Sequence, residues 1–399
     1  MVYKIAMGWL LGAIFFFYYE QGDTIQYFSD ACQLVELAYQ RPLHYLEILG
    51  GTRVPPDSLA LEQQPRAFFF TKLVSLVNLF TNNNYWITSA YFSLLSFSGS
   101  WRLANCIAAH CPPQKYAAGI AFLFYPSVVF WGSGILKESV AVAAIAMIVR
   151  LVLSLQTKDG RKLPWNMLLL GGLAIWVLWR VKYYYAAVLF PTTIAIVVSQ
   201  ALLRNSRGML FLFGISWLTM VLGATLLHPV LSLDHLVEIL VYNHDVIVRL
   251  SDTANVIQFD HLTADVSSLM RNAPLAAVSG LFRPLLGDGH ILLQWAVGLE
   301  NTALLLAALG AIVNVRSVKL GATNRLWVTA TVVYTLVLAT LLAWASPNFG
   351  SLMRYKVAFL PFLVYLCLAG NLRTFGWIAK KLGKAFQKLK VPNRERTES

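Results

Sequence analysis

Two acidic side chains stand at the edges of apolar segments, where an ionised group is costly unless it faces a cavity or a partner. Asp23 follows the first apolar segment, and Glu138 follows a turn that contains two glycines, at residues 132–134. A carboxylate in such a place could act as a general base that takes a proton from a hydroxyl group. Asp23 could instead cap a helix, and Glu138 could complement a helix dipole. Both are candidate catalytic residues.

Cationic side chains occupy the same kind of edge. They are Lys137, Arg180, Lys182, Arg283, Arg354 and Lys356. Arginine can bind a phosphate through two parallel N–H donors, and several cations together can stabilise charge on a leaving group. Each cation taken singly could instead anchor a lipid headgroup. Their number favours a site for an anionic ligand, and we predict that all six bind substrate.

Glu300 lies inside an apolar segment that begins near residue 290. At 1.5 Å per helical residue it is roughly 14 Å deep, where a carboxylate must be neutral or paired. It could form a structural ion pair or contribute beneath the site, and we include it among the predicted substrate-binding residues.

The composition identifies the elements that must position these residues. The chain has 399 residues, of which 57% are hydrophobic and 13% charged, which is typical of a helical membrane protein and not of a large soluble domain. The net charge of +13 does not indicate nucleic-acid binding, because the basic residues concentrate in short loops and in the tail at 379–399, as expected for cytoplasmic segments beside anionic lipids.

The predicted fold is all-α, with about ten transmembrane helices in a single domain over residues 1–378. The first span is Ile5 to Tyr19, and the others are 84–107, 116–133, 135–156, 165–179, 183–203, 208–228, 290–315, 325–346 and 356–378. Residues 66–81 are predicted to be re-entrant or surface-lying, with a full span as the alternative. Outer loops are expected near 20–83 and 228–289, the second with a pair of surface helices.

The positive-inside rule gives the orientation. Basic clusters at 158–162, 204–207 and 316–325 and the tail all fall on the cytoplasmic side if both termini are cytoplasmic. The candidate site residues at the span edges then lie on the extracytoplasmic side. No disulfide is expected from four cysteines, and Cys106, His110 and Cys111 are expected to pack rather than to bind metal.

Several patches resemble bacterial polysaccharide-locus membrane proteins of the GT-C glycosyltransferase superfamily and the O-antigen or exopolysaccharide polymerases. The patches are Asp23 after the first helix, Tyr125-Pro126-Ser127 through Lys137-Glu138, Leu281 to Pro284, Gly298 to Asn301, and Pro347 to Lys356. The resemblance implies a GT-C-like fold in a bacterial inner membrane. It also implies an inverting sugar transfer at the outer leaflet, with an acidic residue of the first outer loop, here Asp23, as base.

The partners implied by this resemblance are a polyprenyl-phosphate-linked sugar donor, a glycan or lipid-linked acceptor, membrane lipids and other polysaccharide-assembly proteins. No cofactor is expected, because Thr24 follows Asp23 where the family commonly has a second acid; a divalent metal is the alternative, which the sequence does not support. The donor could deliver one sugar or a whole repeat unit. A flippase or transporter would also use a charged cavity, but internal repeats are not seen. A non-catalytic assembly subunit would not need the clustered acids and bases.

Overall fold

The computed structural model describes residues 1–52, 59–155, 164–227, 232–314 and 321–371. These residues form helices and contain no β-strand, so the all-α prediction is confirmed for them. The helices are α1 Val2–Ile14, α2 Asp23–Gln40, α3 Pro42–Gly50, α4 Pro65–Thr81, α5 Tyr85–His110, α6 Lys115–Gly119, α7 Pro126–Trp131, α8 Lys137–Ser154, α9 Trp165–Val181, α10 Tyr183–Leu202, α11 Ser206–Leu227, α12 Leu233–Leu250, α13 Val266–Phe282, α14 Leu292–Asn314, α15 Ala322–Ala345, α16 Phe349–Tyr355 and α17 Leu360–Gly370.

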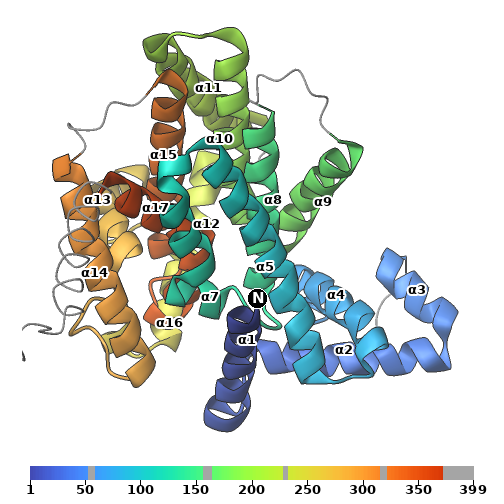
Figure 1. The fold of residues 1–399 in the computed structure, drawn as a ribbon. Coiled ribbons are helices and arrows are strands. Elements are labelled where there is room, and N and C mark those ends of the chain that lie inside the picture. Colours follow the sequence, from blue (N-terminus) through green and yellow to red (C-terminus); the bar gives the residue numbers. More distant parts are fainter. Residues whose placement is uncertain (53–58, 156–163, 228–231, 315–320, 372–399) are drawn as a thin grey trace, which may run out of the picture.

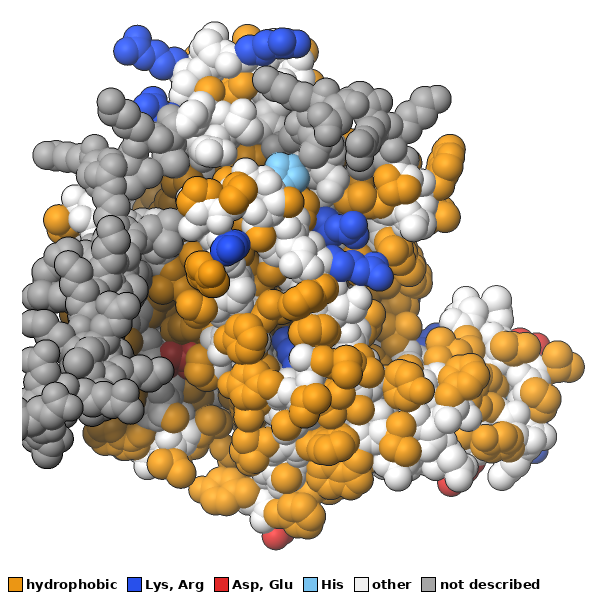
Figure 2. Space-filling view, viewed as in Figure 1, with side chains coloured by type: hydrophobic (Ala, Val, Ile, Leu, Met, Phe, Trp, Pro, Cys, Tyr) orange, Lys and Arg blue, Asp and Glu red, His pale blue; other side chains and the backbone are white. Residues whose placement is uncertain are grey.

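Five helical segments of the described chain are long and apolar enough to cross a membrane. They are Val2–Tyr19, Tyr183–Leu202, Ser206–Leu226, Leu292–Asn314 and Ala322–Ala345, and a sixth is possible if Phe349–Ala358 and Leu360–Gly370, bent by 68°, form one span. Large apolar side chains of the segment Val2–Tyr19 such as Trp9, Leu10 and Phe17 are exposed, and Figure 2 shows hydrophobic side chains over much of the visible surface. The protein therefore has the helices of a membrane protein.

The predicted number of about ten spans is not confirmed, and the helices involved show why. The segment 116–133 is broken before Pro126 into short helices, and α9 has only 17 residues. Serines 89, 93, 96 and 100 are buried in α5, so that helix presents hydroxyls to its neighbours. Most side chains of α8 are buried, which makes it a central helix of the bundle. Apolar composition alone does not separate such a core helix from one that faces lipid.

Close packing fixes α8 against α5. A Cβ atom added to Gly99 of α5 would lie only 2.8 Å from the Cα atom of Ala143 in α8, so glycine permits the two backbones to approach. Small residues allow this kind of contact between helices. Because α8 begins at Lys137 and Glu138, the contact also fixes the position of two candidate site residues.

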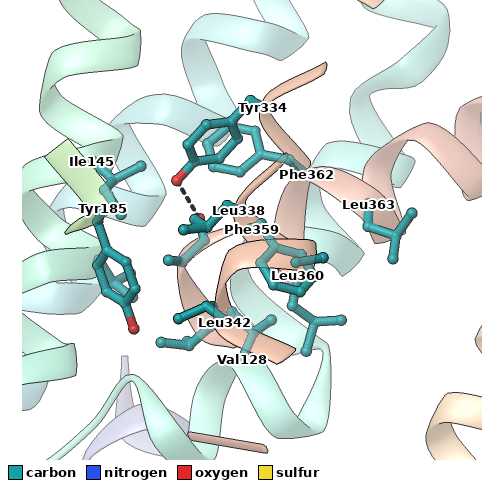
Figure 3. Packing of buried hydrophobic residues seen from close by; sticks show 14 of the residues in the cluster. Val128, Ile145, Tyr185, Tyr334, Leu338, Leu342, Phe359, Leu360, Phe362 and Leu363 are labelled. Atoms are coloured by element: carbon teal, nitrogen blue, oxygen red, sulfur yellow. Dashed lines mark hydrogen bonds between the residues drawn. The ribbon is translucent and has the colours of Figure 1, made fainter. Parts of the chain in front are cut away.

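The apolar core supports the segment that carries Arg354. Figure 3 shows Tyr185, Tyr334, Phe359 and Leu342 packed together, with the Tyr334 hydroxyl donating to the Ala358 carbonyl oxygen at 3.1 Å. The Tyr185 hydroxyl donates to the carbonyl oxygen of Tyr355 at 2.9 Å. Buried polar groups are costly unless they are bonded in this way, so both contacts fix the backbone around residues 355–358.

The start of α1 differs from the predicted topology. Gly8 lies against the turn at residues 132–134, since a Cβ on Gly8 would be 3.0 Å from the Gly134 amide nitrogen, and Lys4 is buried at 2% exposure. The N-terminus accordingly lies in the middle of the molecule, close to the start of α8 (Figure 1). The prediction placed the N-terminus inside and the 132–134 turn outside. The contact at Gly8 therefore brings this turn beside the predicted first span, at less than the thickness of a bilayer core of about 30 Å from the N-terminus.

The two predicted outer segments are helical. Residues 20–83 contain α2, α3 and α4, which lie together beside one end of α5 (Figure 1). Residues 228–289 contain α12 and α13, in agreement with the predicted helix pair. The predicted cytoplasmic segments at 158–162 and 316–319 and the tail at 379–399 lie outside the described residues.

Candidate functional site

Four separate parts of the chain bring charged side chains into one network. The Lys182 Nζ atom lies 2.8 Å from Glu138 Oε1, and Arg354 Nε lies 3.3 Å from the same oxygen. Arg354 then donates from a terminal nitrogen to Asp23 Oδ2 at 2.7 Å. We call this alternating series, Lys182, Glu138, Arg354 and Asp23, the charge chain.

The exposure of the charge chain increases from its middle towards Asp23. The Glu138 side chain is 1% exposed and that of Lys182 4%, whereas Arg354 is 15% and Asp23 40% exposed. Buried charges require partners, and here each buried charge has one. Asp23 is therefore the accessible carboxylate, and Glu138 holds two cations in position.

Local structure explains how these residues reach the network. Gly134 adopts a φ of +71°, a left-handed conformation that glycine tolerates, and the chain then enters α8 at Lys137. Glu138 lies in the first turn of α8, where a negative charge complements the helix dipole. The Asn348 side chain accepts bonds from the amides of Gly350 and Ser351, which starts α16, and Arg354 lies in its last turn.

Aromatic rings lie close to cations in and beside the charge chain. The Lys182 ammonium lies 4.0 Å from the centroid of the Tyr355 ring, and Lys137 lies 5.4 Å from that of Tyr27. Burial would lower the pKa of Lys182, but the adjacent Glu138 carboxylate outweighs it and the pKa is raised, so Lys182 stays cationic. Burial, helped by Asp23 and Glu138, raises the pKa of Tyr27, which stays a neutral phenol.

A cavity of about 670 Å³ opens on one side of the charge chain. We call it the cationic cavity, because four cations line it and, among the described residues, no aspartate or glutamate does. Its lining consists of Gln63, Gln64, Pro65, Arg66, Ala67, Lys137, Trp179, Arg180, Val181, Lys182, Tyr183, Tyr184 and Tyr355. Anions are attracted into a recess of this kind.

Arg66 is a cavity residue that the sequence analysis missed. Its guanidinium lies 3.7 Å from the centroid of the Tyr183 ring, which links the start of α4 to the start of α10. In sequence Arg66 marks only the boundary of an apolar run after Pro65. The available signal was a cation at the edge of an apolar segment in a predicted outer loop. Arg180 was predicted as a site residue because it also stands at the edge of an apolar segment.

A second cavity of about 400 Å³ lies at the other end of the charge chain. We call it the carboxylate cavity, because Asp23 and Arg354 line it. Polar side chains from Gln21, Gln294, Asn348 and Ser351 and aromatic ones from Phe15, Tyr19 and Trp131 also contribute. The charge chain thus runs from Lys182 in one cavity to Asp23 in the other.

Asp23 does not act as a simple local cap. It is the first residue of α2, but its carboxylate pairs with Arg354, which lies 331 positions later in the chain. Asp30, by comparison, is buried and accepts from the amides of Ala60 and Leu61 at 3.3 and 2.9 Å, which is a structural role.

Three predicted binding residues are not among those lining either cavity. Arg283 donates twice to Asp288, at 3.0 Å each, and Lys356 is buried and donates to the carbonyl oxygens of Leu281 and Arg283 at 3.1 and 2.5 Å. Glu300 accepts from the Ser127 amide at 3.1 Å and from the Ser127 hydroxyl. Each is engaged by a partner within the fold, as buried polar groups require, and the structure therefore favours structural roles for them.

No family model, curated protein or solved structure matches the chain. The described residues contain no group of three His, Cys, Asp or Glu side chains that could hold a metal ion. The fold and the site define an all-helical protein with several potential membrane-spanning helices and a buried charge network between two cavities.

Proposed function

We propose that this protein is a multi-pass glycosyltransferase of a bacterial inner membrane, GT-C-like, that acts in cell-surface polysaccharide synthesis. Its donor is a sugar linked to a polyprenyl phosphate. One observation carries the proposal: a half-exposed carboxylate, Asp23, stands at one end of a charge chain whose other end enters a cavity lined by four cations. A base and an anion site joined by a fixed network suit transfer from a phosphate leaving group.

In this mechanism the donor phosphate occupies the cationic cavity and the acceptor hydroxyl lies in the carboxylate cavity. The acceptor oxygen bonds to the anomeric carbon while the bond between that carbon and the phosphate oxygen breaks. The electron pair of the broken bond stays on the phosphate, and the hydroxyl proton passes to Asp23. Lys137, Arg180 and Lys182 stabilise the added negative charge.

Arg354 and Glu138 position the reacting groups. Arg354 orients the Asp23 carboxylate through the 2.7 Å contact. Glu138 lies beneath and holds both Arg354 and Lys182. The same chemistry serves transfer of one sugar or of a repeat unit, so a polysaccharide polymerase is included in the proposal.

Asp23→Asn tests the proposal. The amide keeps the shape of the side chain but loses its basicity, so glycan synthesis should fall about 10²- to 10⁴-fold at normal protein levels. Asp260→Asn, which alters an exposed aspartate away from both cavities, is the matched control. Near-normal synthesis by Asp23→Asn would show that Asp23 is not the base.

The location of lipid-linked intermediates separates the proposal from a flippase. In the Asp23→Asn strain a transferase defect leaves the intermediates on the extracytoplasmic side of the membrane, and a flippase defect leaves them on the cytoplasmic side. Labelling the intermediates in intact and opened cells distinguishes these results, and accumulation inside would contradict the transferase proposal.

A further inference from the structure

Three cations of the cationic cavity form no ion pair with any described residue. They are Arg66, Lys137 and Arg180, whereas the fourth, Lys182, pairs with Glu138. Aromatic rings lie beneath the three: Tyr183 under Arg66, Tyr27 under Lys137 and Phe69 under Arg180, with centroid distances of 3.7, 5.4 and 5.0 Å. An aromatic face orients a cation but does not neutralise it.

The charge chain itself is neutral, since it contains two cations and two carboxylates. Counted over the described residues, the cationic cavity therefore holds three positive charges in excess. A ligand that matches them should bring two or three negative charges. A sugar joined to lipid through one phosphate carries about one negative charge, whereas one joined through a diphosphate carries about two.

We infer that the donor is joined to its lipid through a diphosphate, an inference that rests on the proposed function. In the transfer step the bond between the anomeric carbon and the diphosphate oxygen breaks, and its electron pair stays on that oxygen. The acceptor oxygen bonds to the carbon, and its proton passes to Asp23. The released lipid diphosphate then carries about three negative charges, which the three cations match at the stage when charge develops.

The arginines suit this ligand better than lysines would. A guanidinium can donate two parallel hydrogen bonds to one phosphate, and Arg66 and Arg180 reach the same cavity from different helices, α4 and α9. Two arginines from separate elements can engage two linked phosphate groups. A single phosphate can engage both only if they converge on one point.

Binding of farnesyl diphosphate and farnesyl monophosphate to the purified full-length protein in nanodiscs tests the inference. Farnesol measures the background from partition of the prenyl chain into lipid. At fixed pH and salt, the diphosphate should bind at least about 10-fold more tightly than the monophosphate, because it adds a charge-assisted contact. Arg66→Gln and Arg180→Gln should each remove about 10-fold of diphosphate affinity and much less monophosphate affinity.

Arg271→Gln is the matched control, because Arg271 is exposed on α13 and does not line the cavity. It should leave both affinities unchanged. Equal affinity for the two probes would overturn the diphosphate inference but leave the transferase proposal standing, since a phosphate-linked donor would still bind. Unchanged diphosphate affinity in both arginine variants would also overturn the inference. If neither probe bound above the farnesol background, the proposed function itself would fail.

Discussion

Glu138→Gln is the sharpest test of the charge chain as a structural unit. The substitution keeps the volume of the side chain but removes the anion that lies 2.8 Å from Lys182 and 3.3 Å from Arg354. At an effective dielectric constant of about 20, each pair attracts by roughly 5 to 6 kcal/mol. Desolvation of the ions offsets much of this in the wild type, but the variant leaves buried Lys182 without a carboxylate, while Arg354 keeps its contact with Asp23. Removal of one partner from a buried pair typically destabilises by about 3 to 5 kcal/mol.

The assay is thermal unfolding of the purified protein in detergent, compared at one heating rate because membrane proteins often unfold irreversibly. For a chain of 399 residues the loss should lower the apparent melting temperature by roughly 4 to 6 °C. Glu238→Gln is the control, since that side chain is 66% exposed and surface substitutions usually change stability by less than about 0.5 kcal/mol.

A double variant shows whether the cause is the unpaired cation. Glu138→Gln combined with Lys182→Met also removes the cation left without a carboxylate, so the double variant should be less destabilised than the sum of the single variants. If Glu138→Gln melts within about 2 °C of the wild type and the two changes add, the charge chain does not hold the site together.

Three further outcomes follow from the structure. Burial alone would raise the pKa of Asp288, but hydrogen bonds from Arg283 outweigh it and the pKa is lowered. The pair therefore stabilises the fold at neutral pH. In thermal unfolding, the stability advantage of the wild type over Asp288→Asn should shrink as the pH falls below about 4. Gly99→Ala should destabilise by about 1 to 3 kcal/mol because its Cβ would lie 2.8 Å from the α8 backbone, whereas Gly119→Ala, with open space, should not. A cysteine at position 160 should react with an impermeant reagent only in opened cells, and one at position 261 in intact cells; the reverse pattern would overturn the predicted orientation.

The sequence identified each residue of the charge chain separately, as a candidate site residue. Asp23, Glu138, Lys182 and Arg354 each stand at the end of an apolar segment, and that placement was visible from hydropathy alone. Their pairing was not visible, because it depends on how helices far apart in the chain pack. Contacts such as that between Gly99 and Ala143 fix the position of α8. In the sequence they are marked only by small residues.

Some residues that were predicted to bind substrate instead have partners within the fold. They show the limit of predicting a site from charged residues at the ends of apolar segments. Lys356 also stands beside apolar segments, but its partners are backbone carbonyl oxygens, which every residue carries and no sequence pattern marks. Arg283 has its partner five residues away, in a turn that brings Asp288 back to it. The predicted number of spans is not confirmed for a related reason, since a helix such as α8 is apolar because it is buried in protein.

Arg354 contacts both Glu138 and Asp23, and this double contact couples the two cavities. An anion that draws the Lys182 ammonium towards itself weakens the hold of Lys182 on Glu138, and Glu138 then attracts Arg354 more strongly. Asp23 would then lose part of its contact with Arg354 at the moment the donor is in place. Linkage requires the effect to run both ways, so an acceptor bound at Asp23 should change donor affinity by the same factor that the donor changes acceptor affinity. The coupling between the two cavities would thus be carried by an ionic relay rather than by a moving lid.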